Sequence, residues 1–151
     1  MKCAVITLGC KVNQCESESL ARKMENLGYE IVEHNEKADV YIVNTCCVTA
    51  EGERKSRQAV RKARSLNPDA VIAVTGCAAQ RAPEVFERIE GVTVVAGTKD
   101  KGKIPEMILE HTHLTRVYDI KDFSEYEELP DAAAEKTRAF IKIQDGCNNF
   151  C

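Results

Sequence analysis

Runs of apolar and β-branched residues alternate with segments of helical periodicity, and this alternation limits the fold more than any other feature of the chain. Five runs have the composition of strands, and four segments have that of helices. The predicted strands are 2–8, 29–33, 39–44, 70–75 and 92–96, and the predicted helices are 14–27, 49–66, 83–89 and 104–110. Such alternation favours a mostly parallel sheet with right-handed crossovers. The sequence therefore predicts an α/β fold with a five-stranded, flavodoxin-like sheet, strand order 2-1-3-4-5, and helices on both faces.

Composition divides the 151 residues into three parts. Residues 1–118 carry the predicted α/β domain. Residues 119–136 are rich in acidic residues and poor in apolar ones, which is typical of a solvated linker. Residues 137–151 begin with an alternating, strand-like run and indicate the start of a second domain, which we expect to be truncated at residue 151.

Charge and hydropathy exclude some functions and compartments. The net charge of -3 gives no bulk attraction to nucleic acid, so any RNA contact must come from a local patch. No run approaches the ~18 apolar residues of a membrane span, and the N-terminal apolar run is too short for a signal peptide. We therefore expect a cytoplasmic protein with no membrane partner. In a reducing compartment, eight cysteines favour metal binding or catalysis over disulfides.

Three of these cysteines follow the carboxyl ends of predicted strands, where ligands bind in open α/β sheets. They are Cys10, Cys46 and Cys77. In the order 2-1-3-4-5 their strands are direct neighbours and span ~10 Å, a gap that short loops can close. Three thiolates around an iron–sulfur cluster leave one position without a protein ligand. The pattern thus predicts a [4Fe–4S] cluster with one open iron.

The remaining cysteines of the first domain fit this geometry less well. Cys3 lies ~20 Å from Cys10, near the opposite end of its strand. Cys47 would need a different loop direction from Cys46, and Cys15 falls in the first helical turn after Cys10. A buried free cysteine behaves as a small hydrophobic residue, and that interpretation suffices for all three.

Two other interpretations of the three strand-end cysteines remain open. They are structural cysteines that fall at strand ends by chance, or three ligands of a zinc site completed by a histidine or water. For the zinc site, His34 lies on an edge strand, and His111 and His113 are expected at the surface.

The last five residues form a C-x3-C motif, Cys147 to Cys151. The motif follows a predicted strand and a glycine, where a (β/α) barrel carries its active-site loops. It matches the first two cysteines of the radical-SAM signature C-x3-C-x2-C. A lone C-x3-C is a weak signal, and the three-cysteine domain before it adds weight.

Four motifs together make the chain similar to the radical-SAM methylthiotransferases. They are TLGCKVNQCESE, VNTCCVT, TGCAAQ and IKIQDGCNNFC. The resemblance implies that Cys10, Cys46 and Cys77 bind an auxiliary [4Fe–4S] cluster. It also implies that Cys147 and Cys151 are two of the three ligands of the cluster that binds S-adenosyl-L-methionine (SAM).

The resemblance implies a reaction in which sulfur and then methyl are added at C2 of a modified adenosine beside the anticodon of tRNA. The cofactors would be two [4Fe–4S] clusters and SAM, and the partners the tRNA anticodon stem-loop, an electron donor such as a flavodoxin, and an unidentified sulfur donor. The stretch NTCCVTAEGERKSRQAVR resembles the branch that acts on N6-threonylcarbamoyladenosine, whereas the isopentenyladenosine branch tends to carry Ile-Arg at Val48-Thr49. No catalytic acid or base is predicted, and the 151 residues alone are expected to be inactive.

Alternative functions remain open at this stage. Within the family they are action on isopentenyladenosine in tRNA or on a ribosomal protein. Outside it, the alternative is a non-catalytic metal-binding α/β module. A nucleotide- or flavin-binding domain lacks support, because the loop at Gly9-Cys10-Lys11 is not a G-x-G-x-x-G phosphate loop.

The predicted helix 49–66 gathers basic residues on one half, opposite a small apolar stripe. Those basic residues are Arg54, Lys55, Arg57, Arg61, Lys62 and Arg64. The simpler interpretation is a solvated helix face, and the sharper one is a phosphate-contacting patch for tRNA. If the patch contacts tRNA phosphates, replacing Arg57 and Arg61 with glutamate should weaken tRNA binding and flatten its salt dependence.

Overall fold

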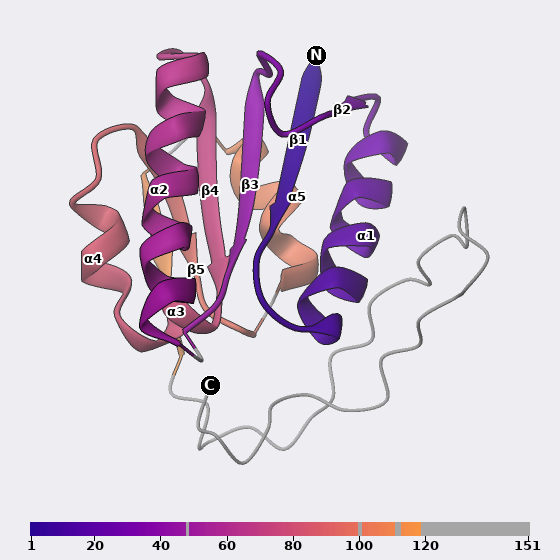
Figure 1. The fold of residues 1–151 in the computed structure, drawn as a ribbon. Coiled ribbons are helices and arrows are strands. Elements are labelled where there is room, and N and C mark those ends of the chain that lie inside the picture. The colour runs from indigo at the N-terminus through magenta and orange to yellow at the C-terminus, as the bar shows by residue number, and fades with distance from the viewer. Residues whose placement is uncertain (48, 100, 111–112, 119–151) are drawn as a thin grey trace.

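The computed structural model describes residues 1–47, 49–99, 101–110 and 113–118, which form a parallel sheet covered by helices (Figure 1). All its strands run parallel, in the order β2-β1-β3-β4-β5-β6. The strands are β1 (Lys2–Thr7), β2 (Glu30–Val32), β3 (Val40–Thr45), β4 (Val71–Gly76), β5 (Val92–Ala96) and β6 (Leu114–Arg116). The predicted α/β class and the order 2-1-3-4-5 are confirmed.

The sheet has six strands, one more than the sequence predicted, because β6 pairs with β5. β5 is therefore an inner strand and not the predicted edge strand. The additional strand is only three residues long and none of them is fully buried, so it has no apolar run that would mark it in the sequence.

Within the described residues, five α-helices and one short 3-10 helix surround the sheet. They are α1 (Lys11–Asn26), α2 (Ala50–Leu66), α3 (Cys77–Arg81), α4 (Pro83–Glu87), η1 (Lys101–Lys103) and α5 (Ile104–Leu109). Thr49 caps α2 as predicted, because its side-chain oxygen accepts a hydrogen bond from the Gly52 amide at 3.0 Å. In the part of the chain that the structure describes, no helix is both long and apolar enough to cross a membrane.

Two hydrophobic cores confirm the predicted helices on both faces. Successive strand residues point to opposite faces, so β3 contributes to both cores. Tyr41 and Val43 pack in the core under α2 and α4, and Val40 and Ile42 pack in the core under α1 and α5. The helices contribute Val60, Ala63 and Phe86 to the first core, and Leu20, Met24, Ile104 and Met107 to the second.

Several sequence-based predictions lie outside the described residues. They concern the linker 119–136, the start of a second domain at 137–151, the C-x3-C pair Cys147 and Cys151, and His111.

Candidate metal centre

The three strand-end cysteines lie where their strands meet the following helices, at the lower edge of the sheet in Figure 1. Cys10 is the N-cap residue of α1, Cys46 directly follows β3, and Cys77 is the first residue of α3. Cys10 is exposed, Cys46 is buried and Cys77 is half-buried. We call this edge the cysteine rim.

The sheet register brings the loops of the cysteine rim together. Thr45 pairs with Gly76, so the residues that immediately follow them, Cys46 and Cys77, leave neighbouring strands at the same level. Gly9, with φ +105°, lies directly against Cys46: a Cβ atom at Gly9 would be 2.9 Å from the Cys46 Sγ. The loop that carries Cys10 therefore passes over the sulfur of Cys46.

Electrostatic interactions place Cys77 near the same group of thiols. Burial raises the pKa of the Cys77 thiol to about 11. The positive charge of Lys101 lowers this pKa. The charges of the Cys47, Cys10 and Cys46 thiols raise it further, with Cys47 having the largest effect of the three and Cys46 the smallest. Since charges interact measurably only over short distances, all four sulfurs belong to one neighbourhood.

The thiols are neighbours, yet they do not form a closed site for a single ion. Within residues 1–47, 49–99, 101–110 and 113–118, no three His, Cys, Asp or Glu side chains are close enough together to hold one metal ion. A zinc ion needs all of its sulfur ligands at about 2.3 Å from one point. The described part of the rim is thus not preformed for a mononuclear zinc site.

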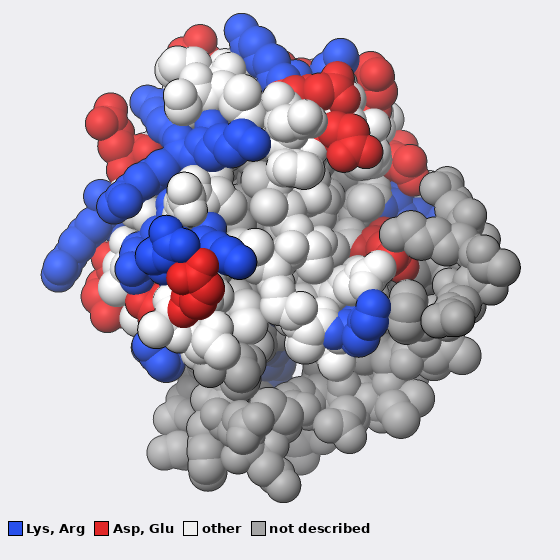
Figure 2. All heavy atoms as spheres, viewed as in Figure 1, with Lys and Arg blue, Asp and Glu red and all other residues white. Residues whose placement is uncertain are grey.

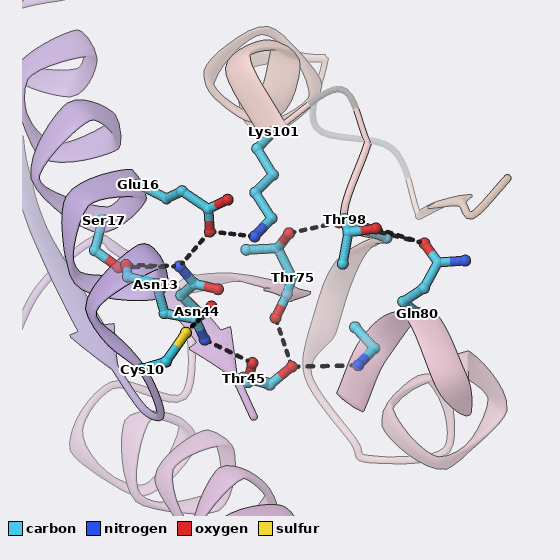
Figure 3. A network of polar contacts seen from close by, with 12 residues as sticks. Cys10, Asn13, Glu16, Ser17, Asn44, Thr45, Thr75, Gln80, Thr98 and Lys101 are labelled. Atoms are coloured by element: carbon cyan, nitrogen blue, oxygen red, sulfur yellow. Dashed lines mark hydrogen bonds and ion pairs between the residues drawn. The ribbon is translucent and has the colours of Figure 1, made fainter. Parts of the chain in front are cut away.

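A buried asparagine on α1 connects two of the cysteine loops (Figure 3). The Asn13 Nδ2 donates to the carbonyl oxygens of Leu8, at 2.7 Å, and of Thr45, at 3.0 Å. Its Oδ1 accepts a long contact of 3.8 Å from the Cys10 thiol. One side chain thereby joins the loop before Cys10 to the end of the strand before Cys46.

A second buried asparagine, Asn44 on β3, extends this connection (Figure 3). Its Nδ2 donates to the Asn13 carbonyl oxygen at 3.0 Å and to the Ser17 Oγ at 3.2 Å. Its Oδ1 has no hydrogen-bond partner among the described residues, although it is buried. That oxygen lies 2.6 Å from where a Cβ atom of Gly76 would be, so it packs against the residue that precedes Cys77.

A buried ion pair lies behind the rim. Lys101 on η1 contacts Glu16 on α1, and each side chain is only 3% exposed. The Asn44 Nδ2 lies 3.5 Å from the Glu16 Oε2, so the pair adjoins the asparagine network. Because the charge of Lys101 also lowers the pKa of Cys77, a fixed positive charge lies within reach of the thiols.

The other sequence candidates are placed as follows. Cys3 is fully buried, and burial raises its pKa to about 12, which agrees with its interpretation as a core residue. Cys15 is half-buried in α1. Cys47 is half-buried and close enough to influence the pKa of Cys77, so it lies near the rim cysteines and is not kept apart from them by the direction of its loop. His34 is exposed on the turn after β2, and its nearest ion-pair contact is Glu33 at 3.8 Å.

Sequence reasoning missed the polar residues behind the cysteines. Asn13, Glu16, Asn44 and Lys101 are all buried. Their neighbours come from distant parts of the chain, so spacing along the sequence carries no sign of them. The available signal was the presence of polar residues at positions where the helix and strand patterns predict burial, as at Asn44 within an apolar strand.

Residues 2–97 match the family model described as "Uncharacterized protein family UPF0004". The chain is 46% identical over 150 residues to the threonylcarbamoyladenosine tRNA methylthiotransferase MtaB of Bacillus subtilis, covering 96% of this chain and 33% of the relative. It is 35% identical over 158 residues to MtaB of Aquifex aeolicus, covering 100% of this chain and 38% of the relative.

It is also 38% identical over 157 residues to the tRNA-2-methylthio-N(6)-dimethylallyladenosine synthase of Moorella thermoacetica, covering 97% of this chain and 35% of the relative. The chain thus spans about a third of the length of these relatives. The chain belongs to the UPF0004 family, the N-terminal domain of the methylthiotransferases.

Proposed function

We propose that this chain is the N-terminal part of a tRNA methylthiotransferase, in which Cys10, Cys46 and Cys77 hold an auxiliary [4Fe–4S] cluster. The observation that carries the proposal is the cysteine rim itself: three thiols follow three adjacent parallel strands, and the Cys10 loop lies against the Cys46 sulfur. Family membership supports it, because the similar enzymes are named for methylthio transfer to tRNA.

The residues of the rim fit such a cluster. Thiolates are the usual protein ligands of iron–sulfur clusters. Gly9 and Gly76 place no side chains next to Cys46 and Cys77, so the backbone can approach a bulky inorganic group closely. When bound, the cluster supplies an iron without a protein ligand, at which sulfur for the transfer can be held. Because the pKa of Cys77 is raised, binding must displace its proton, and cluster assembly should become easier as the pH rises.

The remaining cofactors follow from the resemblance rather than from the described residues. Cys147 and Cys151 would be two ligands of a second [4Fe–4S] cluster that binds SAM. SAM would provide both the radical that activates the C–H bond and the methyl group. An electron donor such as a flavodoxin would reduce this cluster, in the cytoplasm. The cofactors carry this chemistry, and the protein supplies ligands and orientation.

The proposed substrate is N6-threonylcarbamoyladenosine in tRNA, modified at C2. The relative with 46% identity is named for this nucleoside, which supports the proposal. Three other relatives named for it are 35–36% identical, and four named for dimethylallyladenosine are 33–38% identical. Action on dimethylallyladenosine, or on a ribosomal protein, is the alternative within the family. A non-catalytic metal-binding module is the alternative of another class.

Anaerobic reconstitution tests the proposal directly. The 151-residue chain is treated with ferrous iron, sulfide and a thiol reductant, desalted, and analysed for iron, sulfide and zinc and by EPR after reduction. The Cys147→Ala/Cys151→Ala double variant is the reference, so that iron bound by the C-x3-C motif does not contribute to the measured iron content. We expect about four iron and four sulfide per chain. We expect this content to fall to a small fraction in Cys10→Ala, Cys46→Ala and Cys77→Ala, each made in the reference background.

Cys3→Ala and Cys15→Ala in the same background are the matched controls, and both should retain the cluster. The iron content of Cys47→Ala decides whether the Cys47 thiol is also a ligand of the cluster. Retention of iron by all three rim variants would refute the ligand assignment. Zinc in place of iron and sulfide would favour the non-catalytic module.

A further inference from the structure

A hollow of about 630 Å³ lies between β1 and α2 on the face of the sheet that carries the α2 helix. Its floor is apolar and its wall is basic. The floor includes Val5, Ile6, Thr7 and Leu8 of β1 and the following loop, and the wall includes His34, Lys55, Gln58, Ala59, Arg61 and Lys62. We call it the β1–α2 groove.

The groove exists because one helix is missing from the crossover between β2 and β3. Residues 33–39 join these strands directly, with no helix between them. Ile6 and Leu8 consequently stay half-buried, although β1 is paired on both sides. In Figure 1, no helix lies in front of β1, and β3 separates it from α2 in the view. The exposed floor belongs to an inner strand, where burial under a helix is the ordinary arrangement.

The basic residues of α2 are not equally available to a ligand. Arg57 pairs with Glu53 at 2.6 Å and Arg54 pairs with Glu51 at 2.7 Å, so these two cations are already engaged. Within the described part of the chain, no ion pair is found for Arg61 or Lys62, and both are exposed. Figure 2 shows Lys and Arg side chains over α2 beside an uncharged, hollowed surface over β1. The cations that line the groove are Lys55, Arg61 and Lys62, and Lys55 also lies 3.7 Å from Glu51. Arg61 and Lys62 are thus the lining cations without an ion pair among the described residues. Arg57, which sequence reasoning had paired with Arg61, does not line the groove.

The groove leads to the cysteine rim. Thr7 lines the groove and also lines a second hollow, of about 530 Å³, whose other walls include Gly9, Cys10 and Lys11. An elongated ligand in the groove would thus extend to the edge of the sheet where the proposed cluster lies. Such a molecule needs negative charge for the wall and flat apolar surface for the floor.

We propose that the β1–α2 groove binds a single-stranded segment of the RNA substrate next to the target nucleoside. Arg61 and Lys62 contact phosphates, and the half-buried Ile6 and Leu8 support a base or ribose. Charge complementarity favours RNA, because the chain as a whole carries a net charge of -3 and only a local basic wall can attract a polyanion. This inference rests on the proposed function, since it assumes that the substrate is RNA.

Photocrosslinking tests the location without altering the protein. The reconstituted chain is mixed with an anticodon stem-loop RNA that carries 4-thiouridine at single loop positions, irradiated, digested and analysed by mass spectrometry. We expect crosslinks within residues 5–8 or 58–62, or at His34, from loop positions adjacent to the target nucleoside.

Charge reversal tests the energetics. Arg61→Glu/Lys62→Glu should raise the Kd for the stem-loop by about ten-fold or more at low salt, and should reduce the slope of log Kd against log salt by roughly 1.4 for two lost phosphate contacts. The control, Arg88→Glu/Lys103→Glu, makes the same charge change at two exposed residues outside the groove. It should leave the slope unchanged. Ile6→Thr should weaken binding but keep the wild-type slope, because it alters the floor and no charge.

Other outcomes overturn the proposal. They are equal weakening by the control pair, crosslinks confined to other surfaces, and no binding of the stem-loop. Crosslinks to the groove from an added peptide of the longer protein, with none from RNA, would identify the groove as a protein–protein surface instead. Iron and sulfide content is measured on every sample, so failure of RNA binding with an intact cluster would leave the cluster assignment standing.

Discussion

At the scale of single residues, the rim depends on side-chain amides as much as on thiols. The loops that carry the cysteines leave backbone carbonyl groups without partners in the sheet, and an unpaired buried carbonyl costs about 1–3 kcal/mol. Asn13 satisfies two of them, those of Leu8 and Thr45, with one amide group. Asn13 thereby holds both cysteine loops in place, although it would not itself bind the metal.

Cys3 contrasts with the rim cysteines and gives a prediction about pH. Its thiol is fully buried, and burial raises its pKa from 9.0 to about 12. Between these values the unfolded chain loses the thiol proton while the folded protein keeps it. The unfolded state then binds fewer protons, so the free energy of unfolding falls as the pH rises above 9, by up to about 1.4 kcal/mol per pH unit.

Urea denaturation of the apo chain under reducing conditions measures this slope. The experiment covers about 2 to 3 pH units around the ordinary thiol pKa, from pH 8.0 to 10.5. Cys3→Ala should lower the stability overall but flatten the alkaline decline. Cys15→Ala, a half-buried cysteine, is the matched control and should retain the wild-type slope. An unchanged slope in Cys3→Ala would mean that other groups, such as the buried Tyr29, cause the decline.

At the scale of elements, the turn from β4 to α3 carries the tightest backbone constraint of the rim. Gly76 has φ +96°, and a Cβ atom there would be 2.5 Å from the Thr45 carbonyl oxygen and 2.6 Å from the Asn44 Oδ1. Contacts this short with backbone cannot be relieved by rotating a side chain. Gly28, after α1, has a similar φ of +88° but nothing within 4 Å of its Cβ position.

These two glycines form a matched pair for a prediction. Gly28→Ala should cost about 1–2 kcal/mol, the penalty of a left-handed conformation alone. Gly76→Ala should cost clearly more, because β3 and β4 must separate to admit the methyl group, and it should reduce iron incorporation. Denaturation of the apo chain and iron analysis after reconstitution give the two measurements. Equal costs with full iron content in both variants would show that the rim tolerates this displacement.

Elements with a strong apolar period were predictable from sequence, and short polar ones were not. The strands from β1 to β5 and the helix α2 with its Thr49 cap were predicted within a few residues. α3, η1 and β6 were missed, because each is five residues or fewer and has neither an apolar run nor a first-turn proline to mark it. β2 and α4 are as short but were marked by Ile31-Val32 and by Pro83. The cysteine positions followed from strand ends and parallel order, which are local and topological properties. The partners of Asn13 and Asn44 depend on contacts about 30 residues apart in the chain, so local pattern contained no sign of them.

At the scale of the whole molecule, the ion pair between Lys101 and Glu16 links the two ends of the described fold. The residues are 85 positions apart, on η1 and on α1. Lys23, also on α1, donates to the Gly102 carbonyl oxygen at 2.9 Å, so the same two segments meet at a second point. Cys10 is the N-cap residue of α1, and the charge of Lys101 acts on Cys77. The pair therefore couples the first cysteine loop to the segment that completes the sheet.

Removing one member of this pair should be more damaging than removing both. Lys101→Met leaves the Glu16 carboxylate buried without its cation, at an expected cost of about 3–5 kcal/mol in unfolding free energy. Lys101→Met/Glu16→Gln removes the uncompensated charge and should recover a substantial part of that loss. Denaturant unfolding of the two single variants and the double variant gives the coupling energy, with the exposed Lys103→Met as control. Additive losses would mean that the two side chains are stabilised independently by their other contacts, and that the fold is not joined through this pair.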